Sequence, residues 1–194
     1  MTRAEEVMAT QSRKTLGFWI YLMTDCILFA SLFATFVVLR VGTAGGPSGV
    51  DIFSLPFVLL ETMLLLTSSF TIGLATLGAQ RGYKGQSMVW LGSTFLLGAA
   101  FLSLELWEFN QLIAEGNGWQ RSAFLSSYFV LVGTHGLHIA VGLLWLIVAA
   151  MRLLRHRFKA TDLHRLSLLG LFWHFLDIIW IFIFTIVYLI GGMA

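Results

Sequence analysis

The chain has 194 residues, of which 58% are hydrophobic and only 11% are charged. Because soluble domains carry about 25% charged residues, this composition excludes an ordinary soluble protein and predicts an integral membrane protein built as one domain. The formal net charge of +2 is too small to indicate a nucleic-acid partner. The single cysteine, Cys26, excludes an intrachain disulfide and a CxxC site.

Five apolar segments follow one another along the chain, at about residues 17–39, 55–78, 88–109, 124–151 and 167–190. Each exceeds the ~20 residues that an α-helix needs to cross ~30 Å of hydrocarbon. Transmembrane β-strands would be segments of about 10 residues with alternating hydrophobicity, a pattern that the sequence does not show. We therefore predict an all-α membrane bundle of five transmembrane helices over residues 17–194, preceded by a tail at residues 1–16.

Lysine and arginine are distributed unevenly between the connections. Ten of the twelve lie in the N-terminal tail and in the second and fourth connections, whereas only Arg40 and Arg121 lie on the opposite side. Because cytoplasmic connections carry the excess of these residues, we predict a cytoplasmic N-terminus and a periplasmic C-terminus. The densest group is RLLRHRFK (Arg152–Lys159), which has the charge to attract anionic lipid headgroups.

Ionisable residues interrupt all five apolar segments. In chain order they are Asp25, Glu61, Glu105, Glu108, His135, His138, His174 and Asp177. Such groups are costly in lipid, by roughly 2.5–3.5 kcal/mol for an acid at the centre of a span, so we expect them to face the bundle interior. At ~1.5 Å per residue, four of them fall in the outer half of the membrane and the others in the inner half or near the midplane. This spacing predicts an inner and an outer polar cluster.

These eight residues allow four interpretations. A metal site would resemble di-iron bundles, but the pairs here are Glu-x-x-Glu, His-x-x-His and His-x-x-Asp at different depths. A haem would need His138 and His174, which also differ in depth. A small autonomous transporter or proton channel would use Asp25, His174 and Asp177. The residues alone favour the fourth interpretation, a network that is hydrogen-bonded across helices and fixes their packing, and they leave the proton path open.

Large aromatic residues fall at two depths. Near the ends of the spans, where amphipathic rings prefer the headgroup level, lie Trp19, Trp90, Trp119 and Tyr188. Trp173 and Trp180 lie deeper, within the stretch FWHFLDIIWIF (Phe172–Phe182). We expect these two rings either to pack in the core or to line a cleft for a lipid or a quinone tail.

Four motifs in order along the chain resemble subunit III of haem–copper terminal oxidases. They are FWIYLMTDCILFASLFAT (Phe18–Thr35), LSLELWEF (Leu102–Phe109), GTHGLHIAVGLLWL (Gly133–Leu146) and FWHFLDIIWIF. The five spans and the segment GTAGGPSGVDIFSLPFVLLET (Gly42–Thr62) resemble the ubiquinol-oxidising, cytochrome bo-type branch in particular. Asp25 stands where cytochrome c-oxidising relatives usually have Glu.

The resemblance implies a multi-pass protein of the bacterial inner membrane. It would be a non-catalytic subunit of a quinol oxidase that reduces oxygen to water with proton translocation, without a catalytic residue, metal ligand or cofactor of its own. Haems and copper are expected in subunit I, and subunits II and IV are expected as further partners. The chain would bind phospholipid, or alternatively ubiquinone, in a cleft between its helices, and would support assembly and sustained proton uptake by subunit I.

The resemblance also assigns expectations to single residues. Asp25 matches a buried carboxylate of the cleft region. The positions that match residues tying the helices together are Glu105, His135, His138, His174 and Asp177. On this basis we expect His174 and Asp177 to offset each other's burial cost in a network that includes His138 or Glu105.

Overall fold

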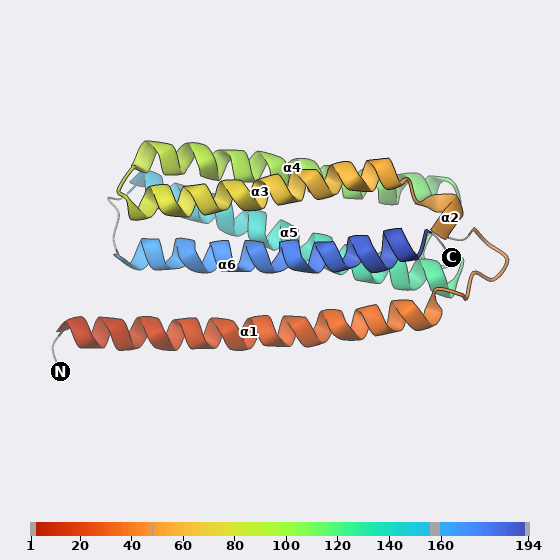
Figure 1. Cartoon of the computed structure of the whole chain (residues 1–194), viewed down its shortest axis with the longest axis horizontal. Helices are drawn as coiled ribbons and strands as arrows, with labels where there is room; N and C mark the ends of the chain where they lie inside the picture. The colour runs from red at the N-terminus through yellow and green to blue at the C-terminus, as the bar shows by residue number, and fades with distance from the viewer. Residues whose placement is uncertain (1–2, 48, 156–159, 193–194) are drawn as a thin grey trace.

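The computed structural model describes residues 3–47, 49–155 and 160–192, and these residues form helices joined by short connections. The elements are α1 (Arg3–Leu39), α2 (Gly49–Ile52), α3 (Leu55–Gln80), α4 (Lys84–Ala114), α5 (Ala123–Arg155), α6 (Ala160–Ile183) and the π-helical segment η1 (Phe184–Ile190), which continues α6. Five helices are long and apolar enough to cross a membrane, which confirms the predicted all-α bundle. The chain begins and ends at opposite ends of this bundle (Figure 1).

The helices are longer than the apolar segments in the sequence. Helix α1 already begins at Arg3, so most of the predicted tail is helical, although its membrane-crossing part begins at Gln11. Helices α4 and α5 extend to Ala114 and Arg155, because a hydrophobic window marks only the part of a helix that lies in hydrocarbon. The orientation in the membrane stays a prediction. Two of the cations on which it depends, Arg157 and Lys159, lie outside the described residues.

Helices α5 and α6 lie at the centre of the bundle, and the other three long helices pack against them. Helices α3 and α4 form a closely packed antiparallel hairpin, α6 contacts both α3 and α5, and α4 contacts α5 (Figure 1). Helix α1 lies along α5 and α6 at the edge of the bundle. The turn between α3 and α4 is tight because Gly82 has a φ of 79°, a conformation that favours glycine. This arrangement leaves much of the surface of α1 exposed.

Glycines on two helices make room for a buried tryptophan of a third. Trp173 of α6 is 1% exposed, and its ring lies between Gly98 of α4 and Gly142 of α5. A Cβ added at Gly98 would lie 2.8 Å from Cζ2 of Trp173, and one added at Gly142 would lie 3.0 Å from Cζ3. The indole N–H donates a hydrogen bond to the Ser68 hydroxyl of α3 at 2.9 Å. Trp173 therefore links α6 to three neighbouring helices.

Gly98→Ala is expected to lower the free energy of unfolding by about 1–3 kcal/mol, because the added methyl group overpacks a filled core. An SDS-unfolding titration of the full chain in mild detergent measures this change. Gly92 of the same helix is the matched control, since a Cβ there meets nothing within 4 Å. Gly92→Ala should be neutral or slightly stabilising, because alanine is the better helix former. Equal losses at the two positions would contradict the close approach of Trp173 to α4.

Candidate functional site

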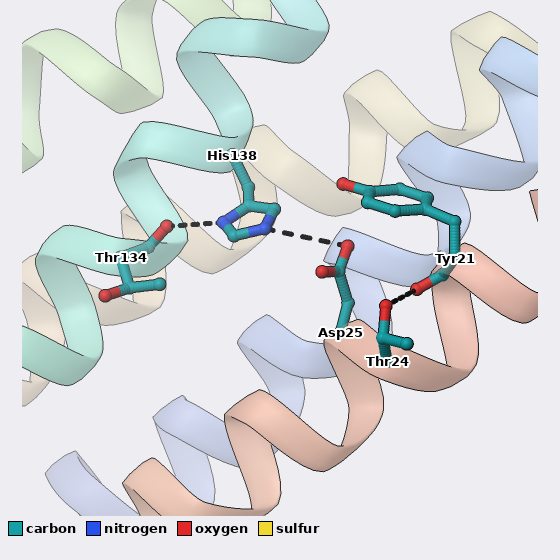
Figure 2. A network of polar contacts seen from close by, with 5 residues as sticks. All are labelled: Tyr21, Thr24, Asp25, Thr134 and His138. Carbon is teal, nitrogen blue, oxygen red and sulfur yellow. Dashed lines mark hydrogen bonds and ion pairs between the residues drawn. The ribbon is translucent and has the colours of Figure 1, made fainter.

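One polar contact joins α1 to α5. Nε2 of His138 lies 3.6 Å from Oδ2 of Asp25, and Nδ1 of His138 donates to the Thr134 carbonyl oxygen at 2.7 Å (Figure 2). Tyr21, one turn before Asp25, directs its hydroxyl toward the same space (Figure 2). Because a carbonyl oxygen only accepts, Nδ1 carries a hydrogen, so any hydrogen between the ring and Asp25 must come from Nε2 or from the carboxyl group. The contact therefore places the polar side chains of α1 and α5 against each other.

We expect Asp25 and His138 to stabilise the packing of α1 on α5 by about 0.6–1.7 kcal/mol, the range measured for polar contacts between membrane helices. A double-mutant cycle with Asp25→Leu and His138→Leu isolates this energy, since each single variant leaves the other group without its partner. Unfolding in detergent is the measurement. Strictly additive losses would show that the two residues do not interact.

An outer cluster of carboxyl and phenol groups joins α3, α4, α5 and η1. Glu61, Glu105 and Glu108 are at most 9% exposed, and Tyr128 and Tyr188 are fully buried. The Tyr188 hydroxyl donates to Oε2 of Glu108 at 3.3 Å and lies 3.0 Å from the Tyr128 hydroxyl. The structure thus brings together the three acids of the predicted outer cluster and adds the two tyrosines, while their outer side stays a prediction.

Several polar atoms of this cluster have no hydrogen-bond partner in the described chain. They include both carboxyl oxygens of Glu61, one of Glu105 and both ring nitrogens of His135. The His135 ring lies between aromatic neighbours, 5.3 Å from the Trp180 ring and 6.0 Å from Phe101. Buried polar atoms are normally satisfied, often by ordered water, so the cluster has hydrogen-bonding capacity beyond its own side chains. Within the described residues no group of three His, Cys, Asp or Glu side chains is placed to hold a metal ion.

The third polar cluster lies between α3 and α6 and differs from the expected network. Nδ1 of His174 lies 2.6 Å from the Ser69 hydroxyl, and Asp177 is buried beside them at 8% exposure. The His174 side chain itself is exposed, and it contacts neither His138 nor Glu105. Residues three apart on a helix point in directions about 60° apart, so Asp177 points inward while His174 points to the edge of α6.

Sequence reasoning missed the partners of the large side chains. Tyr188 was predicted at the headgroup level but is fully buried, because η1 turns it toward Glu108. Two hydroxyl groups of α3 accept hydrogen bonds from tryptophans of α6. The Thr62 hydroxyl accepts from the Trp180 indole N–H at 3.0 Å, and the Ser68 hydroxyl accepts from the Trp173 indole N–H. For Ser68 the available signal was the run LLLTSSFT, which has four hydroxyl residues inside an apolar segment.

A hollow of about 270 Å³ lies at the opposite end of the bundle from the outer cluster, between α5 and α6. Arg152, Asp162 and Arg165 line its polar side, and Trp145 and Leu91 lie on its apolar side. An ion pair joins Arg165 to Asp162 at 4.0 Å. The hollow therefore combines positive charge with apolar walls at the end that we predict to be cytoplasmic.

The fold and these clusters define the class of the protein: an all-α, multi-pass membrane protein whose buried polar residues act between its helices. The sequence matches the cytochrome c oxidase subunit III family over residues 2–192, and the chain belongs to this family. The resemblance carried by the four motifs is thereby confirmed, and the alternative of an autonomous transporter is not favoured.

Bacterial relatives agree with this assignment. The chain is 60% identical to the cytochrome bo(3) ubiquinol oxidase subunit 3 of Pseudomonas aeruginosa, over 91% of this chain and 85% of the relative. It is 48% identical to the protein of the same name from Buchnera aphidicola, over 93% of each chain. It is 44% identical to the quinol oxidase subunit 3 of Bacillus spizizenii, over 91% of this chain and 86% of the relative. Together with the five spans, these relatives indicate a multi-pass protein of the bacterial inner membrane.

Proposed function

We propose that the chain is subunit III of a ubiquinol-oxidising haem–copper oxidase, where it supports assembly and sustains proton uptake by subunit I. The observation that carries this proposal is the 60% identity over 91% of the chain to a ubiquinol oxidase subunit. Subunits I, II and IV are the proposed partners, and the haems and copper are assigned to subunit I. This chain contributes structure and carries out no redox chemistry.

The polar clusters support an assembly role. In the outer cluster, Tyr188 of η1 donates to Glu108 of α4 and lies beside the Tyr128 hydroxyl of α5, so these contacts join three elements. The Asp25–His138 pair adds a polar contact to the packing of α1 against α5. A subunit that is held in one arrangement presents a defined surface to its partners. Because this surface is already ordered, association loses less conformational entropy.

We also propose that a phospholipid occupies the hollow between α5 and α6, with ubiquinone as the alternative occupant. Arg152 and Arg165 carry the positive charge that a phosphate group requires, and a second hollow of about 490 Å³ beside them adds Arg155. Basic pockets between membrane helices bind anionic lipid headgroups in this way. The apolar wall at Leu91 and Trp145 suits the start of an acyl chain.

Affinity purification of the tagged chain in mild detergent tests the proposed function. A haem-containing partner should co-elute with quinol-dependent oxygen uptake, while the separated chain should be colourless. Lipid extraction and mass spectrometry of the same sample should recover anionic phospholipid. Isolation of the chain alone, coloured or competent in transport after reconstitution, would contradict the proposal.

Asp177→Ala is expected to reduce the amount of assembled oxidase more than the turnover of each assembled complex. The substitution removes the buried carboxyl group that interacts with Ser69 and His174. The packing of the helices should lose about 0.6–1.7 kcal/mol of stability, the range for a polar contact between membrane helices. Asp177→Asn, which keeps hydrogen-bonding capacity, is the matched control. The ratio of haem absorbance to tagged chain measures assembly, and oxygen uptake per haem measures turnover. Normal assembly of the Asp177→Ala variant with abolished proton pumping would contradict this prediction.

A further inference from the structure

His174 is the exception among the ionisable residues near the middle of the described spans. The acids at these depths and His135 are buried, whereas the side chain of His174 is exposed on α6. It lies close to the middle of the segment Thr161–Ile190, which is long enough to cross the membrane. Ionisable groups at this depth are costly in lipid and almost always face protein or water. The position of His174 is therefore unfavourable for a chain that is surrounded by lipid alone.

Exposed hydroxyl groups in the spans avoid this cost and His174 does not. Thr24, Thr67 and Thr185 donate to carbonyl oxygens of their own helices at 2.6–2.8 Å, so they present few unsatisfied polar atoms. His174 uses only one ring nitrogen, Nδ1, in its contact with Ser69. No hydrogen-bond partner for Nε2 is present in the described part of the chain, and the ring cannot reach a carbonyl group of its own helix with both nitrogens.

Exposed apolar side chains surround His174. Ile178 and Ile181, at 54% and 45% exposure, follow it on the same stripe of α6, four and seven residues later. On α3, Leu66 and Phe70 flank Ser69 and are 36% and 66% exposed. We call these residues, with Ser69 and His174, the His174 face. An apolar surface with one central polar group is typical of a contact between membrane helices that includes an interhelical hydrogen bond.

A buried chain of polar groups holds the His174 ring in place. Asp177 lies behind the face with Oδ1 unpartnered, and Ser69 lies beside it and contacts Nδ1. Because Nδ1 is held, Nε2 has a fixed direction on the surface. A fixed direction lowers the entropy that a hydrogen bond to a partner would cost.

We propose that the His174 face docks a transmembrane helix of another oxidase subunit, and that this helix carries a hydrogen-bonding side chain level with Nε2 of His174. The proposal rests on the proposed function and adds the surface through which the chain meets a partner. Lipid tails have no group that can satisfy Nε2, whereas a serine, threonine, amide or carboxyl side chain does. The apolar residues of the face pack against the same helix.

Site-specific photocross-linking in the intact oxidase tests this assignment. A benzophenone amino acid in place of Ile178 should form an adduct with another subunit, identified by mass spectrometry. The control position is Leu96 of α4, which is 70% exposed and lies on a helix that contributes no residue to the His174 face. Leu96 should give several-fold less of that adduct. Only lipid adducts, or only dimers of this chain, from position 178 of an intact oxidase would overturn the docking proposal and leave the proposed function standing. If no oxidase co-purified with the chain, both would fail.

Variants of His174 test the hydrogen bond itself. His174→Leu should reduce the partner retained in a harsher detergent by roughly three- to tenfold, the consequence of losing one hydrogen bond between membrane helices. His174→Gln should retain most of the partner, because an amide can both donate and accept. The thermal unfolding of the separated chain shows whether either variant alters its own fold. Retention by His174→Leu equal to that of the unmodified chain would overturn the proposal.

Discussion

Trp180→Ala is expected to lower the free energy of unfolding by about 3–5 kcal/mol, as large-to-small changes of buried aromatic residues do. Trp180 has no exposed surface, and its ring meets Phe101 edge-on at 4.6 Å and lies 5.3 Å from the His135 ring. Its indole N–H also donates to the Thr62 hydroxyl at 3.0 Å. Alanine would leave a cavity where α3, α4, α5 and α6 meet, because rigid helices relax into such a space only in part.

The measurement is an unfolding titration of the full chain in detergent, and Trp107→Ala is the matched control. Trp107 lies on α4 and is 56% exposed, so its removal should change stability by less than about 1 kcal/mol. Trp180→Phe separates two causes, since it keeps most of the ring volume and removes the hydrogen bond to Thr62. It should fall between the unmodified chain and Trp180→Ala. Equal losses for Trp107→Ala and Trp180→Ala would show that burial does not decide the effect.

The number and type of the helices could be predicted because length and apolar content alone determine whether a segment crosses the membrane. The position of each polar residue along its helix followed from the fixed rise per residue. The outer side of Glu61, Glu105, Glu108 and His135 depends on the predicted orientation and stays a prediction. Helix rotation was harder to predict. A rotation of about 60° separates Asp177, which is buried, from His174, which is exposed.

The partners of the polar residues could not be predicted, because they come from helices far apart in the sequence. His138 or Glu105 was expected in the network of His174 and Asp177, whereas His138 lies against Asp25 of α1. His174 contacts Ser69 of α3, one of several hydroxyl residues that the sequence does not distinguish. The stretch FWHFLDIIWIF thus carries two kinds of residue: Trp173 and Trp180 pack the interior, and His174 faces outward. A sequence that encodes a subunit contains residues whose environment is supplied by another chain.

Gly136→Val is expected to lower the free energy of unfolding by about 3 kcal/mol, at the upper end of the range for overpacked cores. A Cβ at Gly136 of α5 would overlap the carboxyl group of Glu105 on α4. Glu105 is 2% exposed, and Glu61 and Glu108 lie near it, so its carboxyl group has little space into which it could move. The glycine therefore permits α4 and α5 to approach with a carboxyl group between them.

A second substitution shows whether Glu105 is the cause. Glu105→Ala removes the overlapping group, so the double variant should lose less stability than the two single variants added together, by about 1–3 kcal/mol of coupling. Gly133→Val is the control on the same helix, because its Cβ would meet the Phe109 ring at an ordinary 3.6 Å while carrying the same cost of a β-branched residue. If Gly133→Val and Gly136→Val cost the same, and Glu105→Ala rescues neither, Glu105 does not fill the space beside Gly136. The outer cluster would then have to be placed elsewhere between the helices.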